Sequence, residues 1–182
     1  VLAVVPSAGY ILEDKLPLNH TSYSDEMVFK QIEKTKGENL KTVSFTEDLL
    51  SLKSKGTSPY YKTDHHWTTP AAFAAYQKLS EALGYVPASD TEFTLEYYPD
   101  FYGTTYSASG YFLRDADTLE IMRSETDDNI CVEITEGDKT EKYSSMYFES
   151  HLREDDMYPV FLDGNHSLVR IKNIGANGGR LL

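Results

Sequence analysis

The sequence predicts an α/β fold, in which a parallel sheet is flanked by helices and carries a small inserted antiparallel β region. Three observations lead to this prediction. Residues 1–5 are a continuous apolar run rich in β-branched side chains, which is typical of a strand buried on both faces of a parallel sheet. Strand and helix patterns then alternate over the first half of the chain. The second half instead holds short strands separated by polar turns, which favours antiparallel pairing.

The expected elements of the first half are a strand at 1–5, a helix at 23–36, a strand at 40–45, a short helix at 46–55 and a helix from residue 69. The turn Pro6-Ser7-Ala8-Gly9 ends the first strand. Ser24 is placed to cap the next helix. One face of that helix is expected to hold Met27, Val28, Gln31 and Ile32. Thr46 is placed to cap the short helix, whose acidic first turn favours the helix dipole.

The helix from residue 69 has the clearest start and end signals in the chain. Thr69 is expected to be its N-cap and Pro70 its first residue, where the missing N–H of proline costs nothing. Gly84 is expected to be the C-cap. An apolar stripe at helical spacing is formed by Ala72, Tyr76, Leu79 and Leu83.

The second half is expected to contain short strands at 92–98, 119–123, 130–135 and 141–148. Residues 160–162, 167–172 and 181 onward are expected to return to the core sheet. We therefore predict a single α/β domain over residues 1–182, incomplete, with a β insertion at about 115–150.

Composition and charge exclude several classes of function. The 17 basic and 29 acidic residues give a net charge of −12, which argues against nucleic-acid binding and against adsorption to anionic membranes. No run approaches the roughly 18 apolar residues of a membrane helix, so no direct membrane insertion is expected. The 14 tyrosines suit a polar groove, such as one for carbohydrate, and equally suit half-buried strand faces.

The cysteine content and the two ends of the sequence bear on disulfide bonding and on whether the chain is a fragment. The single cysteine, Cys131, excludes an internal disulfide, and its mid-strand position favours a small core residue over a reactive thiol. The first residues lack the basic region of a signal peptide. Both ends look like strands of a larger protein, so we expect the chain to be a fragment.

Asp64 and His66 are the strongest catalytic candidates. In an extended stretch, residues two apart point to the same side, so this pair would share one face while His65 and Trp67 share the other. A carboxylate that accepts from one imidazole nitrogen fixes the ring and leaves the other nitrogen to act as a general base.

Two other interpretations of the same residues stay open. Asp64 could simply cap the following helix beside a surface histidine. Alternatively, His65 and His66 could ligate a metal, although zinc sites need three or four ligands and His20, His151 and His166 are distant in sequence. We therefore predict no metal site.

Further polar residues could contact a substrate or a developing oxyanion. Residues 98–112 interleave aromatic side chains with glycine and hydroxyl residues, and Tyr102, Gly103 and Ser107 are the candidates there. Asn165 could point its amide at a reacting oxygen, although a Gly164-Asn165 hairpin turn is favoured. Ser7 follows a buried strand but lacks the Gly-x-Ser-x-Gly elbow, so we interpret it as a turn serine.

The segment YYKTDHHWTTPAAFAAYQKL, residues 60–79, closely resembles the signature of the bacterial DHHW protein family. VVPSAGYILEDKLP, FYGTTYSASG and VFLDGNHSLVRIKN resemble other segments of that family in the same order, so the resemblance covers most of the chain. The family is related to alginate O-acetylation proteins of the AlgX and AlgJ type, whose domain is SGNH-hydrolase-like. The resemblance therefore implies an SGNH-hydrolase-like fold.

The resemblance also implies roles for particular residues. Asp64 would be the acidic member of a Ser-His-Asp triad, His66 its general base, and His65 the variable residue between them. The Asp and His are two residues apart, which resembles the alginate-type proteins rather than the spacing of three usual in SGNH hydrolases. The serine nucleophile is expected in a segment after Leu182, so the chain by itself is expected to be inactive.

The implied function is a cell-surface O-acetyltransferase or acetylesterase that acts on a polysaccharide. The location would be extracellular or in the cell envelope, with a signal or anchor segment outside this chain. The resemblance implies a glycan substrate and a membrane-bound acyl-transfer partner protein, and it implies no cofactor. Two alternatives are a non-catalytic carbohydrate-binding or scaffold protein of the envelope and a metal-dependent hydrolase built on His65 and His66.

Overall fold

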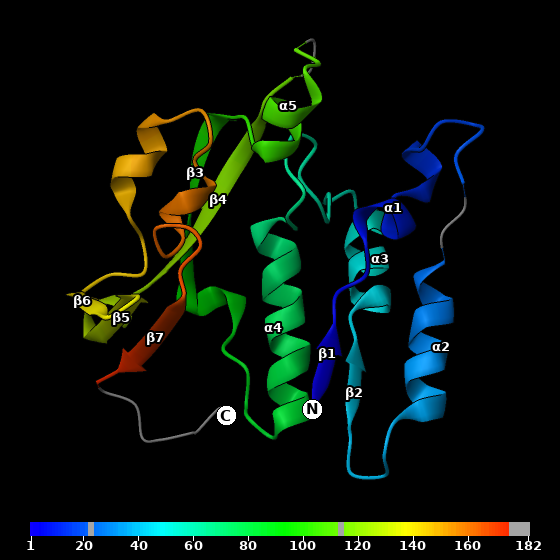
Figure 1. Ribbon diagram of the computed structural model, residues 1–182, viewed down its shortest axis with the longest axis horizontal. Helices are drawn as coiled ribbons and strands as arrows, with labels where there is room; N and C mark the ends of the chain where they lie inside the picture. The colour runs from blue at the N-terminus through cyan, green and yellow to red at the C-terminus, as the bar shows by residue number, and fades with distance from the viewer. Residues whose placement is uncertain (22–23, 113–114, 175–182) are drawn as a thin grey trace. The chain divides into compact units, whose positions relative to one another are not determined.

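The computed structural model describes residues 1–21, 24–112 and 115–174. The chain divides into two compact units, Val1–Ser89 and Asp90–Leu182, each with its own sheet pairing and its own core (Figure 1). The expectation of one domain with an insertion at about 115–150 stays a prediction. Within the described residues, no helix combines the length and hydrophobicity needed to cross a membrane.

The first unit has the predicted alternation of strands and helices. Its elements are β1 (Leu2–Val4), α1 (Ala8–Ile11), the 3-10 helix η1 (Glu13–Lys15), α2 (Asp25–Thr35), β2 (Thr42–Ser44), α3 (Thr46–Ser54) and α4 (Thr69–Leu83). Strands β1 and β2 pair in parallel, with Ala3 opposite Val43. Figure 1 shows α2 and α4 flanking this pair, so the predicted parallel α/β arrangement is confirmed.

Strand β1 is more exposed than its sequence predicts. Val1, Leu2 and Val5 are 52%, 37% and 47% exposed, although the run was expected to be buried on both faces. Burial of a parallel strand requires neighbours along both edges and helices over both faces. Among the described residues, β1 pairs along one edge only, with β2.

The core of the first unit uses a different face of α4 from the predicted one. It contains Ile11, Val43, Phe45, Leu49, Tyr60, Ala71 and Ala75. Ala71 and Ala75 are one turn apart and let the helix approach the core closely. Tyr76, in the predicted stripe, is instead 42% exposed and its hydroxyl accepts a hydrogen bond from the Ala88 amide at 3.0 Å.

The ends of the helices largely follow the predicted signals. Thr68 rather than Thr69 is the N-cap of α4, and Gly84 ends it with a left-handed φ of 83°, as predicted. Thr46 was expected to cap α3, but it is the first residue of that helix and Phe45 holds the N-cap position. Ser24 is the N-cap position of α2, without a side-chain capping bond, while the expected start at residue 23 lies outside the described residues.

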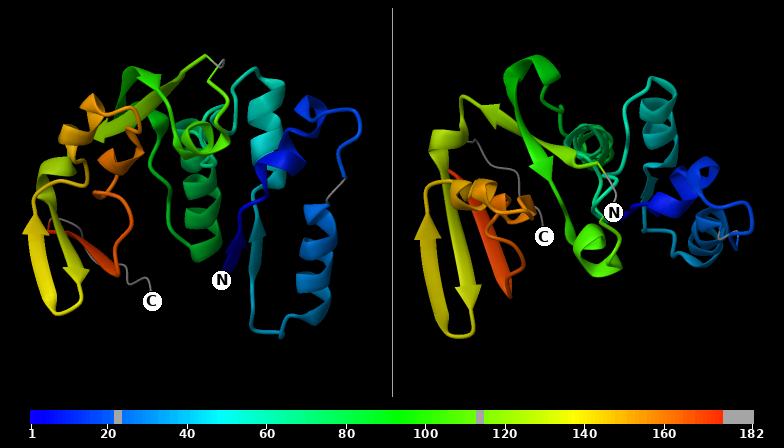
Figure 2. Two further views of the ribbon diagram at one scale, coloured as in Figure 1. Left: turned by 45° about the horizontal axis from the view of Figure 1, so that its top comes forward. Right: turned by 90° about the horizontal axis from the view of Figure 1, so that it is seen from above.

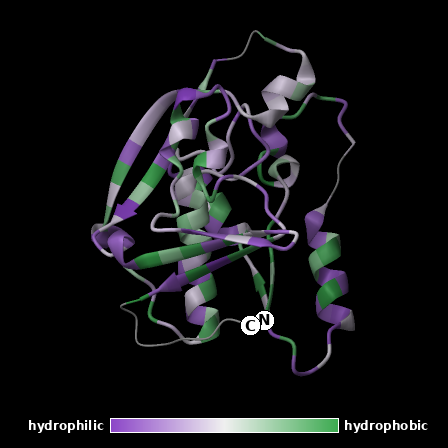
Figure 3. Cartoon of the chain, turned by 60° about the vertical axis from the view of Figure 1, so that its left-hand side comes forward, coloured by the Kyte–Doolittle hydropathy of each residue, from purple (hydrophilic) through white to green (hydrophobic). Residues whose placement is uncertain are grey.

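The apolar face of α2 differs from the predicted one. Figure 3 shows hydrophobic and hydrophilic residues alternating along this helix. Its half-buried positions include Phe29 and Ile32, whereas Met27 is 73% exposed. Of the predicted apolar face, Met27, Val28 and Gln31 are exposed and only Ile32 is half-buried, so that prediction is wrong for three of its four residues.

The second unit contains antiparallel sheets. Its elements are the 3-10 helix η2 (Asp90–Glu92), β3 (Phe93–Phe101), α5 (Thr104–Ser109), β4 (Asp117–Ser124), η3 (Asp127–Asn129), β5 (Ile130–Glu136), β6 (Lys139–Tyr143), η4 (Glu149–Arg153), η5 (Tyr158–Val160) and β7 (Leu168–Asn173). Strand β3 pairs with β4, and the second sheet has the order β6-β5-β7. Figure 2 shows these three strands side by side.

Strand β7 was predicted to return to the parallel core sheet, and this prediction is wrong. It pairs antiparallel with β5, opposite the buried Glu133. Lys172 and Arg170 donate to the Glu133 carboxylate at 2.8 and 3.2 Å, and the Lys172 hydrogen bond is the main cause that lowers the pKa of Glu133 to about 2. A buried carboxylate requires such partners, and the antiparallel pairing of β7 with β5 supplies them.

Three other predictions for the second half are corrected. Residues 160–162 were expected to form a strand, but Val160 ends the 3-10 helix η5 and Phe161 makes only an isolated bridge with Tyr147. The strand expected at 141–148 ends at Tyr143. Cys131 lies in a strand, as predicted, but it is the second residue of β5 and is half-buried rather than part of the buried core. The strand expected from residue 181 lies outside the described residues.

The burial of Leu49 predicts a large loss of stability on truncation. Leu49 in α3 is 0% exposed, so Leu49→Ala should lower the free energy of unfolding by about 2–5 kcal/mol. The neighbouring Leu50 is 43% exposed, and Leu50→Ala should change it by about 0.5 kcal/mol or less. Urea unfolding measures both values. Equal losses in the two variants would contradict the assigned core.

Candidate active site

The candidate catalytic residues lie in a loop whose two ends are joined by hydrogen bonds. Tyr60 and Trp67 form an isolated antiparallel bridge. One residue further out, the Thr68 amide donates to the Pro59 carbonyl at 3.0 Å. Residues 61–66 are therefore held in a closed loop immediately before α4.

A hydrogen bond holds this loop against the end of β1. The hydroxyl of the buried Tyr60 donates to the carbonyl of Pro6, which follows that strand. Burial, and secondarily the negative charge of Asp25, raises the pKa of Tyr60 to about 12, so its hydroxyl keeps its proton. Open α/β sheets place functional loops at such strand ends. Sequence analysis missed this contact because no local pattern links residues 54 positions apart.

Asp64 and His66 form the central interaction of the loop. One carboxylate oxygen, Oδ1 of Asp64, contacts Nδ1 of the His66 ring in a short hydrogen bond and also accepts the His66 backbone N–H at 2.9 Å. The Asp64 side chain is 0% exposed, while that of His66 is 35% exposed. The carboxylate is therefore buried, and the imidazole it holds is accessible.

This geometry prepares His66 for proton transfer. When Nδ1–H donates to the carboxylate, Nε2 becomes the proton-accepting nitrogen of the neutral ring. If the ring gains a proton, the adjacent carboxylate stabilises the imidazolium. The pair can thus act as a general base and its orienting group.

The predicted separation of the loop residues into two faces holds for Trp67 but not for His65. The Trp67 ring packs edge-on against Phe45 of the core, with ring centroids 6.2 Å apart. The His65 ring instead lies 3.9 Å from the His66 ring, and its Nδ1 is 3.8 Å from Asp64 Oδ1. The segment is bent rather than extended, so the alternation expected of a strand does not apply.

Asp64, His65 and His66 together also offer three ligand atoms within 4.8 Å of one another, which is compatible with a metal ion. In this structure Asp64 Oδ1 and His66 Nδ1 are joined by a hydrogen bond, so binding an ion through both atoms would require that bond to open.

Ser7 occupies a capping position. Its hydroxyl oxygen accepts the Tyr10 amide at 3.2 Å at the start of α1. Its own backbone N–H donates to the buried carboxylate of Asp25. These contacts agree with the interpretation of Ser7 as a turn serine.

The substrate-contact candidates Tyr102, Gly103 and Ser107 lie together at the start of α5, in the second unit. Gly103 is the N-cap of this helix, and the Ser107 hydroxyl donates to the Gly103 carbonyl at 3.3 Å. The Tyr102 amide donates to the Asp155 carbonyl at 2.9 Å. Because this backbone N–H already has a hydrogen-bond acceptor, it is not available to a substrate. The Tyr102 ring packs against the Tyr106 ring, with centroids 4.6 Å apart.

Asn165 is exposed and follows a turn with an unusual backbone. Leu162 and Asp163 have φ values of 61°, and Gly164 has a φ of 90°. Because residues 160–162 are not a strand, the expected two-residue hairpin at Gly164-Asn165 does not form. The turn instead leads from the 3-10 helix η5 into β7.

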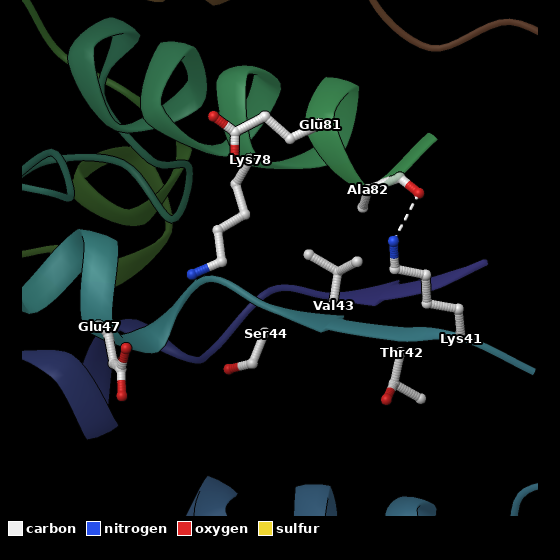
Figure 4. Close-up of a pocket in the computed structure, with 8 residues that line it drawn as sticks. All are labelled: Lys41, Thr42, Val43, Ser44, Glu47, Lys78, Glu81 and Ala82. Atoms are coloured by element: carbon white, nitrogen blue, oxygen red, sulfur yellow. Dashed lines mark hydrogen bonds between the residues drawn. The ribbon is translucent and has the colours of Figure 1, made fainter. Parts of the chain in front are cut away.

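A pocket of about 510 Å³ in the first unit does not include the catalytic candidates (Figure 4). It lies between β2 and α4, and its lining residues are Lys41, Thr42, Val43, Ser44, Glu47, Lys78, Glu81 and Ala82. The Lys41 ammonium donates to the Ala82 carbonyl at 2.8 Å, as Figure 4 shows. The pocket is thus separate from Asp64 and His66.

Residues 1–124 match the family model described as the SGNH hydrolase-like domain of the acetyltransferase AlgX. Among curated proteins, no sequence matches the chain.

Three solved structures share the fold at low sequence identity. A DHHW family protein from Eubacterium siraeum is 21% identical with a TM-score of 0.73, over 96% of this chain and 58% of that one. PatB1 from Bacillus cereus is 19% identical with a TM-score of 0.77, over 97% and 62%. The O-acetyltransferase domain of Pseudomonas putida AlgJ is 20% identical with a TM-score of 0.51, over 70% and 50%. The chain therefore spans less than two thirds of each of these chains.

The Asp64 contact predicts a single tautomer for His66. In the neutral ring, the proton should reside on Nδ1, and Asp64→Asn should produce a mixture because the amide is a weaker acceptor. Nitrogen-15 NMR of the imidazole distinguishes the two forms. His65→Ala is the matched control and should leave the His66 tautomer unchanged. A wild-type ring protonated on Nε2 would contradict the assigned geometry.

The raised pKa of Tyr60 predicts a loss of stability at high pH. Its folded pKa of about 12 lies above the ordinary value of 10.0, so its contribution is complete below pH 10 and is lost as the pH rises towards 12. Wild-type protein should therefore lose more unfolding free energy over this interval than Tyr60→Phe. Urea unfolding at several pH values gives the comparison. If the unfolding free energy falls equally with pH in the two proteins, this prediction is refuted.

Proposed function

The chain belongs to the family of SGNH hydrolase-like domains represented by the acetyltransferase AlgX, and from this premise we propose that it takes part in acyl transfer on a polysaccharide. The observation that carries the proposal is the buried Asp64 carboxylate, which holds both the ring and the backbone of His66. A surface aspartate that merely caps α4 would not require this arrangement. The N-cap position of that helix is occupied by Thr68, without a side-chain capping bond.

The proposed reaction uses a serine that His66 deprotonates. As the serine oxygen bonds to the acyl carbonyl carbon, Nε2 of His66 takes the hydroxyl proton, and Asp64 stabilises the imidazolium. Collapse of the tetrahedral intermediate breaks the ester bond, and His66 returns the proton to the leaving oxygen. A sugar hydroxyl or water then attacks the acyl-serine by the same steps in reverse.

The serine is proposed to come from a segment that follows Leu182, as the resemblance to the DHHW family implies. Two serines near the candidate site have local roles that support this assignment. Ser7 caps α1, and the Ser58 hydroxyl donates to the Tyr60 carbonyl at 2.7 Å. Neither contact resembles a hydroxyl that donates to an imidazole.

The second unit is proposed to contribute glycan contacts. The rings of Tyr102, Tyr106 and Phe112 form a chain, with centroids 4.6 and 5.5 Å apart, and Phe112 is 65% exposed. Exposed aromatic rings present apolar faces to sugars, while hydroxyl and amide groups such as those of Ser107 and Asn165 suit sugar hydroxyls. We assign Tyr102 a ring contact, because its amide is bonded to Asp155.

An extracellular or cell-envelope location and a membrane-bound acyl-transfer partner are part of the proposal. A polysaccharide substrate suits a chain with a net charge of −12, which disfavours nucleic-acid partners. The aromatic chain of Tyr102, Tyr106 and Phe112 also favours a second candidate function, glycan binding without catalysis. Binding of an acetylated glycan by a full-length protein that lacks esterase activity would select this second function.

The proposed mechanism predicts a loss of activity without loss of folding. The full-length protein, including the segment after Leu182, should cleave a p-nitrophenyl acetate-type ester. His66→Ala should lower kcat by at least about 10³-fold, and Asp64→Asn should have a comparable effect, because both remove the activated base. His65→Ala is the control and should stay within a few-fold of wild type. Undiminished activity in His66→Ala would refute the mechanism.

A further inference from the structure

The negative charge of the chain is concentrated in the second unit. Asp90–Leu182 holds 19 of the 29 acidic residues and 8 of the 17 basic ones, which gives it a net charge of −11. Val1–Ser89 holds 10 acidic and 9 basic residues, and its net charge is only −1. Charge that served solubility alone would not need to be confined to one unit. The excess belongs to the unit that is proposed to contact the glycan.

Most of these carboxylates face the solvent. All 19 acidic residues of the second unit lie within the described residues, and 12 of them are exposed. The unit contains two histidines, His151 and His166, and even with both protonated its net charge of −11 would change only to −9. A ligand that approaches this unit therefore meets a negative potential over the whole physiological pH range.

Most of the basic residues of this unit are already paired with its own carboxylates. The buried Glu133 has three cationic partners at 3.4, 3.2 and 2.8 Å, namely Lys142, Arg170 and Lys172. Arg123 lies between Glu96 and Glu149, at 3.1 and 2.7 Å. Four of the six basic residues that the structure describes in this unit are thus engaged, so they are poorly placed to offset the charge of an acidic ligand.

Two exposed carboxylates border the aromatic chain that is proposed to contact sugars. Asp100 is exposed and precedes Tyr102 by two residues. Asp155 is also exposed, and its backbone carbonyl accepts the Tyr102 amide at 2.9 Å. The backbones of both residues therefore lie within about one Debye length of Tyr102, which is ~8 Å at physiological ionic strength. The neighbouring Arg153 and Glu154 are both exposed and carry opposite charges.

We propose that the second unit selects a polysaccharide without acidic groups and disfavours polyuronates such as alginate. A polyuronate carries one carboxylate on each sugar, so its binding would set several negative charges against this surface. Like charges at an interface oppose binding and suppress wrong partners. Aromatic rings contact the apolar face of acidic and neutral sugars alike, so the surrounding charge supplies the discrimination. This inference rests on the proposed function, whose substrate class it narrows.

A pair of ligands that differ only in charge tests this inference. Isothermal titration of the full-length protein should compare alginate oligomers with the same oligomers after methyl esterification of their carboxylates. At low salt, the free acid should bind at least about 10-fold more weakly than the ester, because only the free acid is repelled. At 1 M salt, where the Debye length is about 3 Å, the difference should shrink.

The double variant Asp100→Asn, Asp155→Asn removes the two bordering charges with little change to the backbone. Asn tolerates the left-handed φ of 65° at position 100, and the bond to Tyr102 uses only the backbone of Asp155. This variant should bind the free acid at least about 3-fold more tightly than wild type at low salt, with ester binding changed by less than about 2-fold. The matched control, Asp128→Asn with Asp138→Asn, removes two exposed charges elsewhere in the unit and should have a smaller effect. Circular dichroism checks folding.

The inference is overturned if the free acid binds as tightly as the ester, if salt leaves the difference unchanged, or if neither oligomer binds. Failure of this inference and failure of the proposed function give different results. Equal binding of the two oligomers by a protein with esterase activity would remove the charge selection and leave acyl transfer standing. Preference for the ester in a full-length protein without esterase activity would remove acyl transfer and leave the selection standing.

Discussion

The arrangement of the candidate site depends on one buried negative charge, the carboxylate of Asp64. Its side chain is 0% exposed, and a carboxylate removed from water is stable only when hydrogen bonds replace its hydration. Both the ring and the backbone N–H of His66 provide those bonds. The bend that brings ring and amide to the same oxygen also stacks His65 on His66. The geometry of the whole loop thus follows from satisfying Asp64.

The surrounding core keeps this loop in place. Trp67 packs against Phe45 at one end of the loop, and the Tyr60 hydroxyl reaches Pro6 at the end of β1. These contacts connect the loop to both strands of the parallel pair, since Phe45 follows β2. A base needs a fixed orientation to be effective, and here rigid apolar packing provides it from outside the polar pair.

In the second unit, too, buried charged groups are held by partners of opposite charge. Glu133 is buried in β5, and its need for cationic partners selects β7 as the neighbouring strand. His151 and His166 are largely buried as well, and both turn towards the carboxylate of Asp163. Antiparallel pairing of β5 with β7 brings Glu133 beside Arg170 and Lys172, whereas the contacts of His151 and His166 with Asp163 join η4, a turn and the residues before β7. In both cases the folded chain brings together charged residues that are distant in sequence.

The sequence by itself determined the alternation of strands and helices at the start of the chain, the limits of α4 to within one residue and the pairing of Asp64 with His66, because these depend on neighbours only a few residues apart. It predicted the wrong buried face for α4, a buried rather than an exposed β1, and the wrong partner strand for β7. It also gave no sign that His151 and His166 contact the same aspartate. Those features depend on contacts between distant segments, such as Arg170 and Lys172 with Glu133. Local patterns give an element its type, whereas only tertiary packing decides which face is buried and which distant charges meet.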